Sequence, residues 1–535
     1  MASHTTSEGA RKDASRVEVA AKIGIEYKKE VDFPKWYQQV LTRSEMLDYY
    51  DVSGCYILRP WAYKIWQEIQ QYIDHEIEEI GVENSYFPMF IPAKNLEKEK
   101  EHIEGFAAEV AWVTKAGSNN LDEPLAIRPT SETAMYPYYA KWVRSHRDLP
   151  LRLNQWCSVV RWEFKNPQPF IRNREFLWQE GHTAFATKAE ADLEVQQILE
   201  TYRQVYEDLL AVPVIKGVKS DKEKFAGGLY TTSLEGYIPT TGRGIQAATS
   251  HSLGQNFAKM FDISFEDPQG PLANGDSRPA LHAWQNSWGF STRSLGVMVM
   301  VHGDDKGLVL PPRVAAVQVV IIPCGLNAKA SDEDRLSVER RLAKVLTLLK
   351  KADIRARVDD RDNYSVGYKF NRWELRGVPV RLELGPKDVK NNQIMAARRD
   401  NGAKIALQQT TLVSEVRDLL DSIQRDMFNR AKEIRDANVV FIEEWKDFVP
   451  ALDKKQLCLI PWCEESDCED RIKERSSRSG LAATVDHNEK APSMGAKSLC
   501  IPMDQPVDKK IIQGETKCVS CGKDAKRWAL FGRSY

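Results

Sequence analysis

The feature that most constrains this 535-residue sequence is a pair of segments in which arginine, carboxylate and aromatic residues alternate. One is Arg161 to Glu163, and the other runs from Arg172 to Glu180 beyond a loop at Lys165 to Phe170. The alternation predicts a β-hairpin whose strands point arginines and an aromatic ring at one bound molecule. Guanidinium groups grip phosphate oxygens, and a ring stacks on a base. A surface hairpin of solvated ion pairs is the alternative interpretation.

Length and composition limit the classes of protein that fit. A chain of 535 residues exceeds one hydrophobic core, so two to four domains of about 100–300 residues are expected. The formal net charge of −1 means that any RNA-binding surface is a local patch. No apolar run approaches the roughly 18 residues needed to cross a membrane, so no membrane partner is predicted. Residues 1–16 predict a disordered tail rather than a secretory signal or anchor, which favours the cytoplasm.

Cysteine is concentrated near the end of the chain, where six of the nine cysteines fall from Cys458 onward. Disulfides are improbable without a secretory signal, so metal ligation is the better interpretation. Two close pairs supply four thiolates for a structural Zn²⁺: Cys463 with Cys468, and Cys518 with Cys521. Unligated free cysteines are the alternative. Cys458 and Cys500 lie in apolar, strand-like segments and are predicted to be buried.

Apolar residues at helical spacing predict a long helix over 61–80, which runs through Gly81 into a strand over 85–92. That strand contains Pro88, which cannot donate to a central ladder and is therefore expected at an edge or a subunit interface. Further along, helical patterning covers 188–211. A strand starting at Trp284 turns into a helix near Arg293, beside glycines that permit close approach of a ligand.

Strands and helices alternate from residue 317 onward. Strands are predicted over 317–322, 354–359 and 378–384, and helices from Ser331, where Ser331 and Asp334 form a capping box, and over 366–375. This spacing is typical of a small α/β domain with a parallel or mixed sheet. A charged amphipathic helix over 413–438 then links this domain to the cysteine-rich end of the chain.

Three of these segments resemble, in order along the chain, the signature motifs of the class II aminoacyl-tRNA synthetases. The segment around Pro88 resembles motif 1, the Arg161 hairpin resembles motif 2, and the turn at Arg293 resembles motif 3. Thr292 departs from the commonest motif 3, which has Glu or Asp before the arginine. The α/β domain resembles the anticodon-binding domain shared by the synthetases for proline, threonine, histidine and glycine.

Four stretches make the resemblance more specific: Arg128-Pro-Thr-Ser-Glu-Thr, Arg161-Trp-Glu-Phe, Glu175-Phe-Leu-Trp-Gln-Glu-Gly-His and Leu530-Phe-Gly-Arg-Ser-Tyr. Together they resemble the prolyl-tRNA synthetases of the eukaryotic and archaeal type, over nearly the whole chain from Val17 to Tyr535. Only about 100 residues separate motifs 2 and 3, so neither the inserted editing domain of the bacterial type nor a fused upstream synthetase is expected. Two residues separate Cys518 from Cys521, whereas in relatives of this type one residue separates the corresponding cysteines.

The resemblance implies a multidomain fold of mixed α+β and α/β class. A class II catalytic domain with an antiparallel sheet is expected over 17–312, and an α/β anticodon-binding domain over 313–412. A linker helix over 413–445 and a small zinc-binding α/β domain over 446–535 would follow. The implied reaction activates L-proline with ATP and Mg²⁺ to prolyl-adenylate. Transfer to the 3′ end of tRNA(Pro) follows, giving prolyl-tRNA, AMP and pyrophosphate, in a homodimer formed through motif 1.

The resemblance also implies residue roles. Arg161 and Arg293 are the expected catalytic residues, and no nucleophile is expected. The proline site is expected to comprise Thr130, Glu132, Arg161, Trp178, Phe225 and His251. The ATP site is expected to comprise Arg161, Glu163, Arg172, Phe176, Gln246, Thr249 and Arg293. The anticodon would be read by Glu374, Arg381, Lys387 and Asp388.

Two alternatives remain. A catalytically inactive synthetase-like protein would bind tRNA or regulate, but such proteins usually lose a motif arginine, and Arg161, Arg172 and Arg293 are all present. The second alternative is a related class II synthetase for threonine or histidine. Threonyl enzymes place a zinc-ligand cysteine where Val159 stands here, and Cys157 is out of register, so it is predicted to be a core residue.

Overall fold

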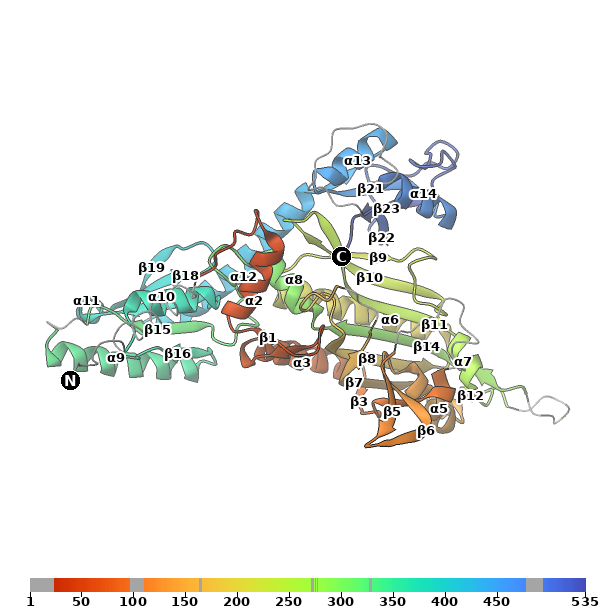
Figure 1. The fold of residues 1–535 in the computed structure, drawn as a ribbon, viewed down its shortest axis with the longest axis horizontal. Helices are drawn as coiled ribbons and strands as arrows, with labels where there is room; N and C mark the ends of the chain where they lie inside the picture. The colour runs from red at the N-terminus through yellow and green to blue at the C-terminus, as the bar shows by residue number, and fades with distance from the viewer. Residues whose placement is uncertain are drawn as a thin grey trace, which may run out of the picture.

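The computed structural model describes residues 24–96, 110–162, 166–270, 274, 276, 278–326, 330–477 and 494–535. A central sheet covered by helices occupies the middle of the molecule, an α/β domain extends to one side, and a small C-terminal domain lies above the sheet (Figure 1). The predicted disordered tail at residues 1–16 and the predicted site residue Glu163 lie outside the described residues.

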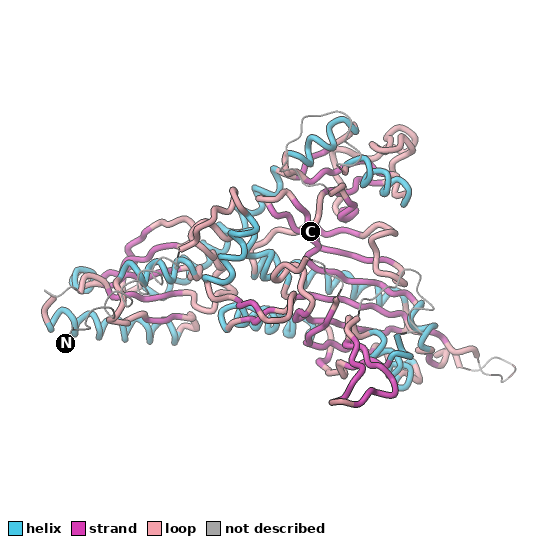
Figure 2. The backbone as a smooth tube through the Cα atoms, in the orientation of Figure 1, coloured by secondary structure: helices cyan, strands magenta, loops and turns pink. Residues whose placement is uncertain are grey.

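One eleven-stranded sheet runs through the catalytic and C-terminal regions, in the order β20-β21-β23-β22-β9-β10-β11-β14-β8-β7-β3. Its strands are β3 (Glu83–Asn84), β7 (Leu151–Val160), β8 (Glu175–Phe185), β9 (Ile215–Val218), β10 (Tyr230–Ile238), β11 (Arg243–Gly254), β14 (Trp284–Ser291), β20 (Val439–Phe441), β21 (Leu457–Trp462), β22 (Lys497–Pro502) and β23 (Arg527–Gly532). From β9 to β7 every pair is antiparallel, as expected for a class II catalytic sheet. The tube view in Figure 2 shows these strands side by side with helices behind them.

Helices α3 (Pro60–Glu79), α6 (Lys188–Gln204) and α8 (Arg293–His302) cover one face of the catalytic sheet. The predicted stripe of α3 is buried at Ile65, Ile69, Ile73 and Ile77, since one apolar face at helical spacing removes those side chains from water. Helix α2 (Phe33–Arg43) contributes Trp36 and Tyr37 to the same core. Among the described residues, no helix combines the length and the apolar composition needed to cross a membrane.

The hairpin of the second motif has a longer loop than the sequence predicts. The strands end at Val160 and begin again at Glu175, so Arg161 and Arg172 belong to the connecting loop rather than to paired strands. The loop turns back on itself through the bridge between Gln168 and Arg172. The reason is apolar burial: Phe170 and Ile171 join the hydrophobic core, and this pulls the loop away from an extended ladder.

The strand predicted over 85–92 is also wrong in extent. The structure has β3 over Glu83–Asn84 and β4 over Phe90–Pro92, and Pro88 lies in neither. Proline has no backbone N–H, so the ladder cannot continue through it. Strand β4 instead joins β5 (Trp112–Ala116) and β6 (Asn119–Ile127) in a small separate sheet, with order β4-β6-β5.

The α/β domain has a five-stranded mixed sheet in the order β16-β15-β17-β18-β19. Its strands are β15 (Val319–Pro323), β16 (Ala356–Val358), β17 (Val380–Leu384), β18 (Gln393–Arg398) and β19 (Lys404–Gln408), with helices α9 (Asp332–Lys351), α10 (Val366–Leu375) and α11 (Pro386–Lys390). Strand β15 is parallel to β16 and β17, and the remaining pairs are antiparallel. Ser331 caps α9 by accepting a hydrogen bond from the backbone N–H of Asp334 at 3.1 Å.

Helix α12 (Leu412–Ala437) ends earlier than the predicted linker helix and is followed by β20. Its first half packs into the core of the α/β domain through Val416, Leu420 and Ile423, because its apolar stripe needs a partner surface. The C-terminal domain adds α13 (Trp445–Asp453) and α14 (Ser466–Ser476) to strands β20 to β23. Cys458 and Cys500 are buried there, as predicted.

Candidate active site

One cavity of about 280 Å³ on the catalytic sheet brings most of the predicted site residues together. Among those that line it are Thr130, Glu132, Arg161, Phe176, Trp178, Phe225, Gln246, Thr249, His251 and Arg293. Arg172 lines an adjoining cavity of about 170 Å³, which shares Arg293 and Gln246 with the first. The predicted proline and ATP sites are therefore one continuous region built on β8, β10, β11 and β14.

Arginines gather at one end of this region. Arg161 donates from Nε to the carbonyl oxygen of Pro129 at 3.0 Å, and its guanidinium lies 5.5 Å from the Phe176 ring. Arg293 donates to the carbonyl oxygen of Ile171 at 3.2 Å from Nη2. Burial lowers the pKa of Arg293, and the neighbouring charges of Arg161 and Arg172 lower it further. Such a group of confined cations favours an anion with several oxygens, such as a polyphosphate.

Aromatic rings form another part of the cavity wall, and the Trp178 ring lies 5.2 Å from the guanidinium of Arg161. The rings of Phe225 and His251 lie 4.9 Å apart, and Trp178 completes the apolar lining. The Thr231 hydroxyl accepts from the backbone N–H of Phe225 at 2.9 Å, so its own hydrogen is free to point at Nδ1 of His251, 2.8 Å away. Burial lowers the pKa of His251 to about 3, so this imidazole is neutral near pH 7. The resulting slot suits a small ring.

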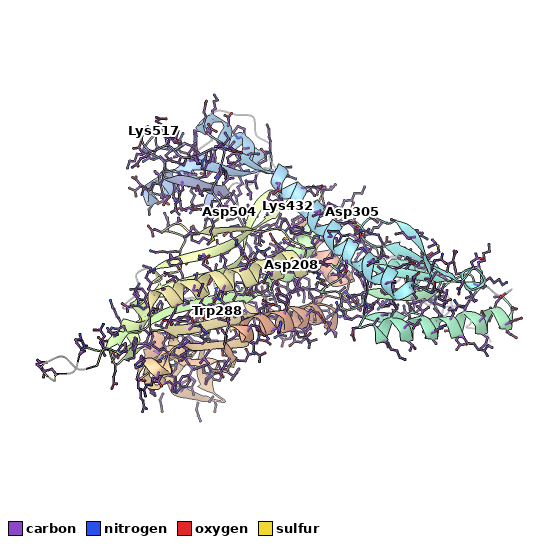
Figure 3. The ribbon with its side chains drawn as sticks, turned by 180° about the vertical axis from the view of Figure 1, so that it is seen from behind. Asp208, Trp288, Asp305, Lys432, Asp504 and Lys517 are labelled. Carbon is purple, nitrogen blue, oxygen red and sulfur yellow. The ribbon has the colours of Figure 1, made fainter. Side chains whose placement is uncertain are left out.

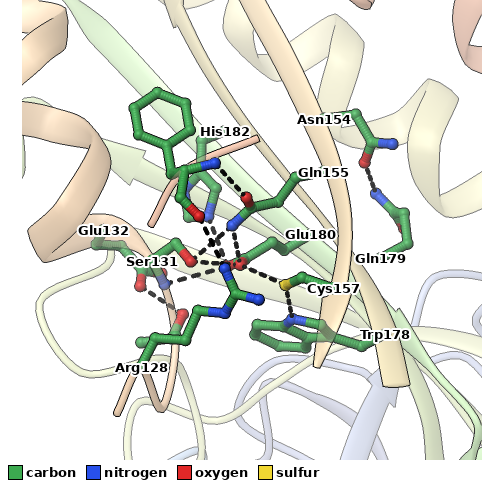
Figure 4. Close-up of polar contacts among 12 residues, drawn as sticks. Arg128, Ser131, Glu132, Asn154, Gln155, Cys157, Trp178, Gln179, Glu180 and His182 are labelled. Atoms are coloured by element: carbon green, nitrogen blue, oxygen red, sulfur yellow. Dashed lines mark hydrogen bonds and ion pairs between the residues drawn. The ribbon is translucent and has the colours of Figure 1, made fainter. Parts of the chain in front are cut away.

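Glu180 lies beneath this slot in a network of hydrogen bonds that the sequence did not lead us to predict (Figure 4). Its carboxylate accepts from the hydroxyl of Ser131 at 2.5 Å and from the backbone N–H of Ser131 at 3.1 Å. It also accepts from Nε2 of Gln155 at 2.7 Å and lies 3.0 Å from Nε2 of His182. Because Glu180 is only 2% exposed, these bonds fix the segment around Ser131 against β8.

The charges in this network are paired. Burial by itself raises the pKa of Glu180, but the hydrogen bonds from His182, Ser131 and Gln155 outweigh it and hold the pKa below the usual value. Burial likewise lowers the pKa of His182, but Glu180 and Glu132 outweigh it and raise that pKa. Glu132 is then the second carboxylate, held by the Thr130 hydroxyl at 2.5 Å. The carboxylates of Glu180 and Glu132 beside His182 offer acceptors that suit a cationic amine.

In the α/β domain the structure brings together two of the four predicted anticodon residues. Glu374 and Arg381 line a cavity of about 190 Å³, where Arg381 stacks on Phe370 at 3.8 Å. Lys387 and Asp388 do not line it and lie on α11. Asp388 accepts from the backbone N–H of Gly385 at 2.8 Å and so caps that helix.

The four predicted cysteine ligands form one cluster in the C-terminal domain, with all their sulfur atoms within 4.8 Å of one another. Sγ of Cys468 lies 3.6 Å from Sγ of Cys518, and Sγ of Cys521 lies 3.6 Å from Sγ of Cys463. A Zn–S bond of about 2.3 Å implies sulfur atoms roughly 3.8 Å apart around a tetrahedral ion. The thiol set therefore fits Zn²⁺ in number, spacing and chemistry.

Comparisons with known proteins agree with this arrangement. The family described as tRNA synthetase class II core domain (G, H, P, S and T) matches residues 112–299, the anticodon binding domain matches 318–419, and the prolyl-tRNA synthetase C-terminal family matches 445–535. The cytoplasmic proline--tRNA ligase of Arabidopsis thaliana is 53% identical over 99% of this chain and 94% of its own. The chain belongs to the prolyl-tRNA synthetase family.

Other members of the prolyl-tRNA synthetase family support the same conclusion. The proline--tRNA ligase of Encephalitozoon cuniculi is 49% identical over 96% of this chain and 99% of its own length. The crystal structure of prolyl-tRNA synthetase from Cryptosporidium parvum, complexed with halofuginone and AMPPNP, matches with a TM-score of 0.88 and 50% identity. That match covers 96% of this chain and 100% of the other.

Several residues that complete this synthetase-like site were absent from the sequence prediction. Glu180 and His182 follow Trp178 at intervals of two, which places all three on one face of β8, so the strand period could have revealed them. Trp288 on β14 also lines the cavity. It packs so closely on Gly181 that an added Cβ there would lie 2.2 Å from the indole, and no sequence pattern signals that contact.

Proposed function

We propose that this member of the prolyl-tRNA synthetase family attaches L-proline to tRNA(Pro) in two steps. Proline's carboxylate attacks the α-phosphate of ATP, forming prolyl-adenylate as pyrophosphate leaves. A ribose hydroxyl at the 3′ end of the tRNA then attacks the mixed anhydride, giving prolyl-tRNA and AMP. The observation that carries this proposal is that one cavity brings carboxylates and aromatic rings together with confined arginines.

At the amino acid end, Glu132 and Thr130 hold the cationic ring nitrogen of proline, because a carboxylate and a hydroxyl offer the acceptors it requires. Trp178, Phe225 and His251 enclose the pyrrolidine ring. The neutral state of His251 avoids placing a second cation beside that nitrogen. Positioning by these groups converts the attack into an effectively intramolecular step.

At the nucleotide end, Arg161 bridges proline's carboxylate and the α-phosphate, where charge builds in the transition state. Arg172 and Arg293 clamp the β- and γ-phosphates, and Phe176 stacks on adenine. The remaining nucleotide contacts are assigned to Glu163, Gln246 and Thr249. Glu223, which lines both cavities, would offer a carboxylate oxygen to the Mg²⁺ that accompanies ATP, and that ion would neutralise phosphate charge.

The remaining parts are assigned to the tRNA and to assembly. The domains follow the boundaries 17–312, 313–412, 413–445 and 446–535, after a tail at 1–16. Glu374 and Arg381, with Lys387 and Asp388 on α11, read the anticodon, and the four-cysteine cluster holds a structural Zn²⁺. The enzyme works as a homodimer in the cytoplasm, the compartment named for the Arabidopsis relative.

Proline-dependent exchange of pyrophosphate into ATP tests the first step. We expect proline alone among the standard amino acids to support exchange, and Arg161→Gln to lower it about 10²- to 10³-fold, as loss of one transition-state donor does. Arg147→Gln, an exposed arginine on the same domain, is the control and should leave exchange unchanged. A folded protein without exchange would support the inactive alternative, and exchange with threonine or histidine would support the related enzymes.

A further inference from the structure

Residues 219–228, which form most of the loop that joins β9 to β10, have two different sides. On one side Glu223 and Phe225 line the substrate cavity. On the other side the loop faces the C-terminal domain, where β22 pairs with β9 and extends the catalytic sheet. The 219–228 loop is therefore the part of the proline slot that the C-terminal domain touches directly.

Lys219 makes the first of these contacts, and it is buried. Its Nζ donates to the backbone carbonyl oxygen of Leu499 on β22 at 2.6 Å and to Oε1 of Glu235 on β10 at 2.6 Å. A buried ammonium group needs such partners, since an unpaired one would lose its hydration without compensation. The base of the loop is thus tied to both domains at once.

Helix α14 makes the second set of contacts. Asp470 forms an ion pair with Lys222, whose pKa is raised first by the hydrogen bond to Asp470 and also by the charges of Glu469 and Glu223. Glu469 is buried against the loop, where burial raises the pKa of its carboxyl and the side chain of Ser220 opposes that shift. Both acidic residues directly follow Cys468, a member of the four-cysteine cluster.

We propose that α14 positions the proline slot. The cysteine cluster fixes the start of α14, Glu469 and Asp470 hold the 219–228 loop, and the loop holds Phe225 against His251. This inference rests on the proposed role of Phe225 in binding proline. Lys222 and Asp470 are positioning residues, because neither lines the cavity.

The arginines of the ATP side are held outside the loop, whereas Glu223 within the loop lines both cavities. Arg161 and Arg293 are held by the carbonyl oxygens of Pro129 and Ile171, which lie outside the loop. Loosening the loop therefore displaces the wall of the proline slot and leaves the arginine cluster in place. The expected signature is a rise in KM for proline that exceeds any rise in KM for ATP, with little change in kcat.

Charge reversal tests the contact between α14 and the loop in the full-length protein. We expect Lys222→Asp and Asp470→Lys each to raise KM for proline about 3- to 10-fold, and the double variant to return within about 2-fold of wild type. Asp524→Lys is the matched control. It breaks the Lys517–Asp524 pair of the same domain, and Lys517 lies at the outer end of that domain, away from Trp288 (Figure 3).

Hydrogen exchange gives a readout that does not depend on activity. The backbone N–H of Lys219 donates a hydrogen bond to the carbonyl oxygen of Thr231 at 2.9 Å. The backbone N–H of Gly228 donates one to the carbonyl oxygen of Phe225 at 3.0 Å. In Asp470→Lys, but not in Asp524→Lys, we expect faster exchange over 219–228 and unchanged exchange in β11 and β14.

The outcomes are distinct. Unchanged KM for proline in both single variants, with unchanged loop exchange, would overturn the inference while leaving the proposed function standing. The inference would also be overturned if KM for proline and KM for ATP rose equally in the single variants and the double variant failed to restore them. Absence of proline-dependent activity in the wild type would refute the proposed function, and loop exchange would then still decide whether α14 holds the loop.

Discussion

Two buried histidines that line the same cavity have pKa values shifted in opposite directions. His182 lies between the carboxylates of Glu180 and Glu132, which outweigh burial and raise its pKa. His251 lies among aromatic rings and a hydroxyl, and burial together with the charges of His182 and Lys219 lowers its pKa to about 3. The cavity therefore combines carboxylates, which attract an amine, with a neutral imidazole and aromatic rings, which offer an apolar surface to a ring.

These two histidines should affect stability in opposite directions as pH changes. The stability that His182 contributes is present below its unfolded pKa near 6.5 and is lost as pH rises through the raised folded value. His251 is neutral in the fold, so the unfolded chain gains its proton below about pH 6.5 and stability falls as pH falls. Melting temperatures of wild type, His182→Gln and His251→Gln between pH 5 and 9 check this.

We expect the wild-type advantage over His182→Gln to shrink as pH rises above 6.5. As pH falls below 6.5, we expect the melting temperature of the wild type to fall relative to that of His251→Gln. Parallel changes in both comparisons would contradict the assignment of charges in the slot.

At the scale of elements, the functional side chains lie where strands and helices end. Arg161 follows the last residue of β7, Arg293 begins α8, and Cys468 lies in the first turn of α14. Each neighbouring element is packed, so the ends are fixed in space although the loops beyond them are irregular. The α/β domain repeats this arrangement, because Glu374 lies in the last turn of α10 and Arg381 is the second residue of β17, and both line one cavity.

Arg381 provides the test for that cavity. Its guanidinium is oriented by Glu383 at 2.8 Å and by the Phe370 ring, so it presents a fixed fork of the kind that recognises guanine edges. We expect Arg381→Ala to lower tRNA charging about 5- to 150-fold, the equivalent of about 1–3 kcal/mol, while proline-dependent exchange stays unchanged. Arg340→Ala on the exposed face of α9 is the control. Equal losses in both assays would remove Arg381 from the anticodon site.

The cysteine cluster is the element-scale test of metal binding. Four thiolates leave no open position for water or substrate, so a zinc ion there would be structural. We expect about one zinc per chain in the purified protein, and Cys463→Ser to lower both the zinc content and the melting temperature of the C-terminal domain. Cys458→Ser, a buried cysteine outside the cluster, should retain zinc. Zinc well below one per chain with full stability would leave unligated cysteines as the better interpretation.

At the scale of the whole molecule, the eleven-stranded sheet makes the C-terminal domain a continuation of the catalytic domain rather than an appended module. The α/β domain forms its own sheet and is joined to the catalytic domain by side-chain packing and by backbone hydrogen bonds such as that from Leu308 to the carbonyl oxygen of Leu375 at 3.0 Å. Arg376 lies 4.0 Å from the ring of Trp61 and 5.4 Å from that of Trp373, one from each domain. A continuous ladder transmits position more rigidly than a side-chain contact, which is consistent with the C-terminal domain setting the geometry of the proline slot.

The exposed aromatic residues near Pro88 form the surface through which we expect two chains to associate. Tyr86 is 70% exposed and Phe90 is 47% exposed, and Trp112 on β5 of the same three-stranded sheet is also exposed. Large apolar side chains that cluster at a surface mark a contact site. We expect sedimentation at micromolar concentration to give twice the 61.0 kDa chain mass, and Phe90→Asp to shift it toward one chain.

Leu336→Asp is the matched control for this dimer prediction. Leu336 is 46% exposed on α9 of the α/β domain, so its replacement changes charge and exposure equally but should leave the dimer intact. A stable 61.0 kDa monomer of the wild type would refute the dimer.

The sequence by itself determined which chemistry is available and which elements form. Apolar spacing located α3 and α10, and the strand-to-helix turn at Arg293 was predicted where the structure has it. Residue type alone indicates the chemistry of the arginines, aromatic residues and paired cysteines, because few other side chains bind phosphate or coordinate zinc. The domain boundaries, residue roles and metal content remain predictions.

Tertiary structure alone decided how distant segments meet. Glu180 joins Ser131 and Gln155 from three separate segments, and α14 reaches the 219–228 loop across about 250 residues of sequence, so local patterns carry no trace of either contact. The loop after β7 is not a simple hairpin because Phe170 and Ile171 are buried in the hydrophobic core. The strand predicted around Pro88 is interrupted because proline has no backbone N–H to donate. Burial and hydrogen bonding are satisfied by the whole fold, and for that reason the sequence pattern predicted the residues but not their contacts.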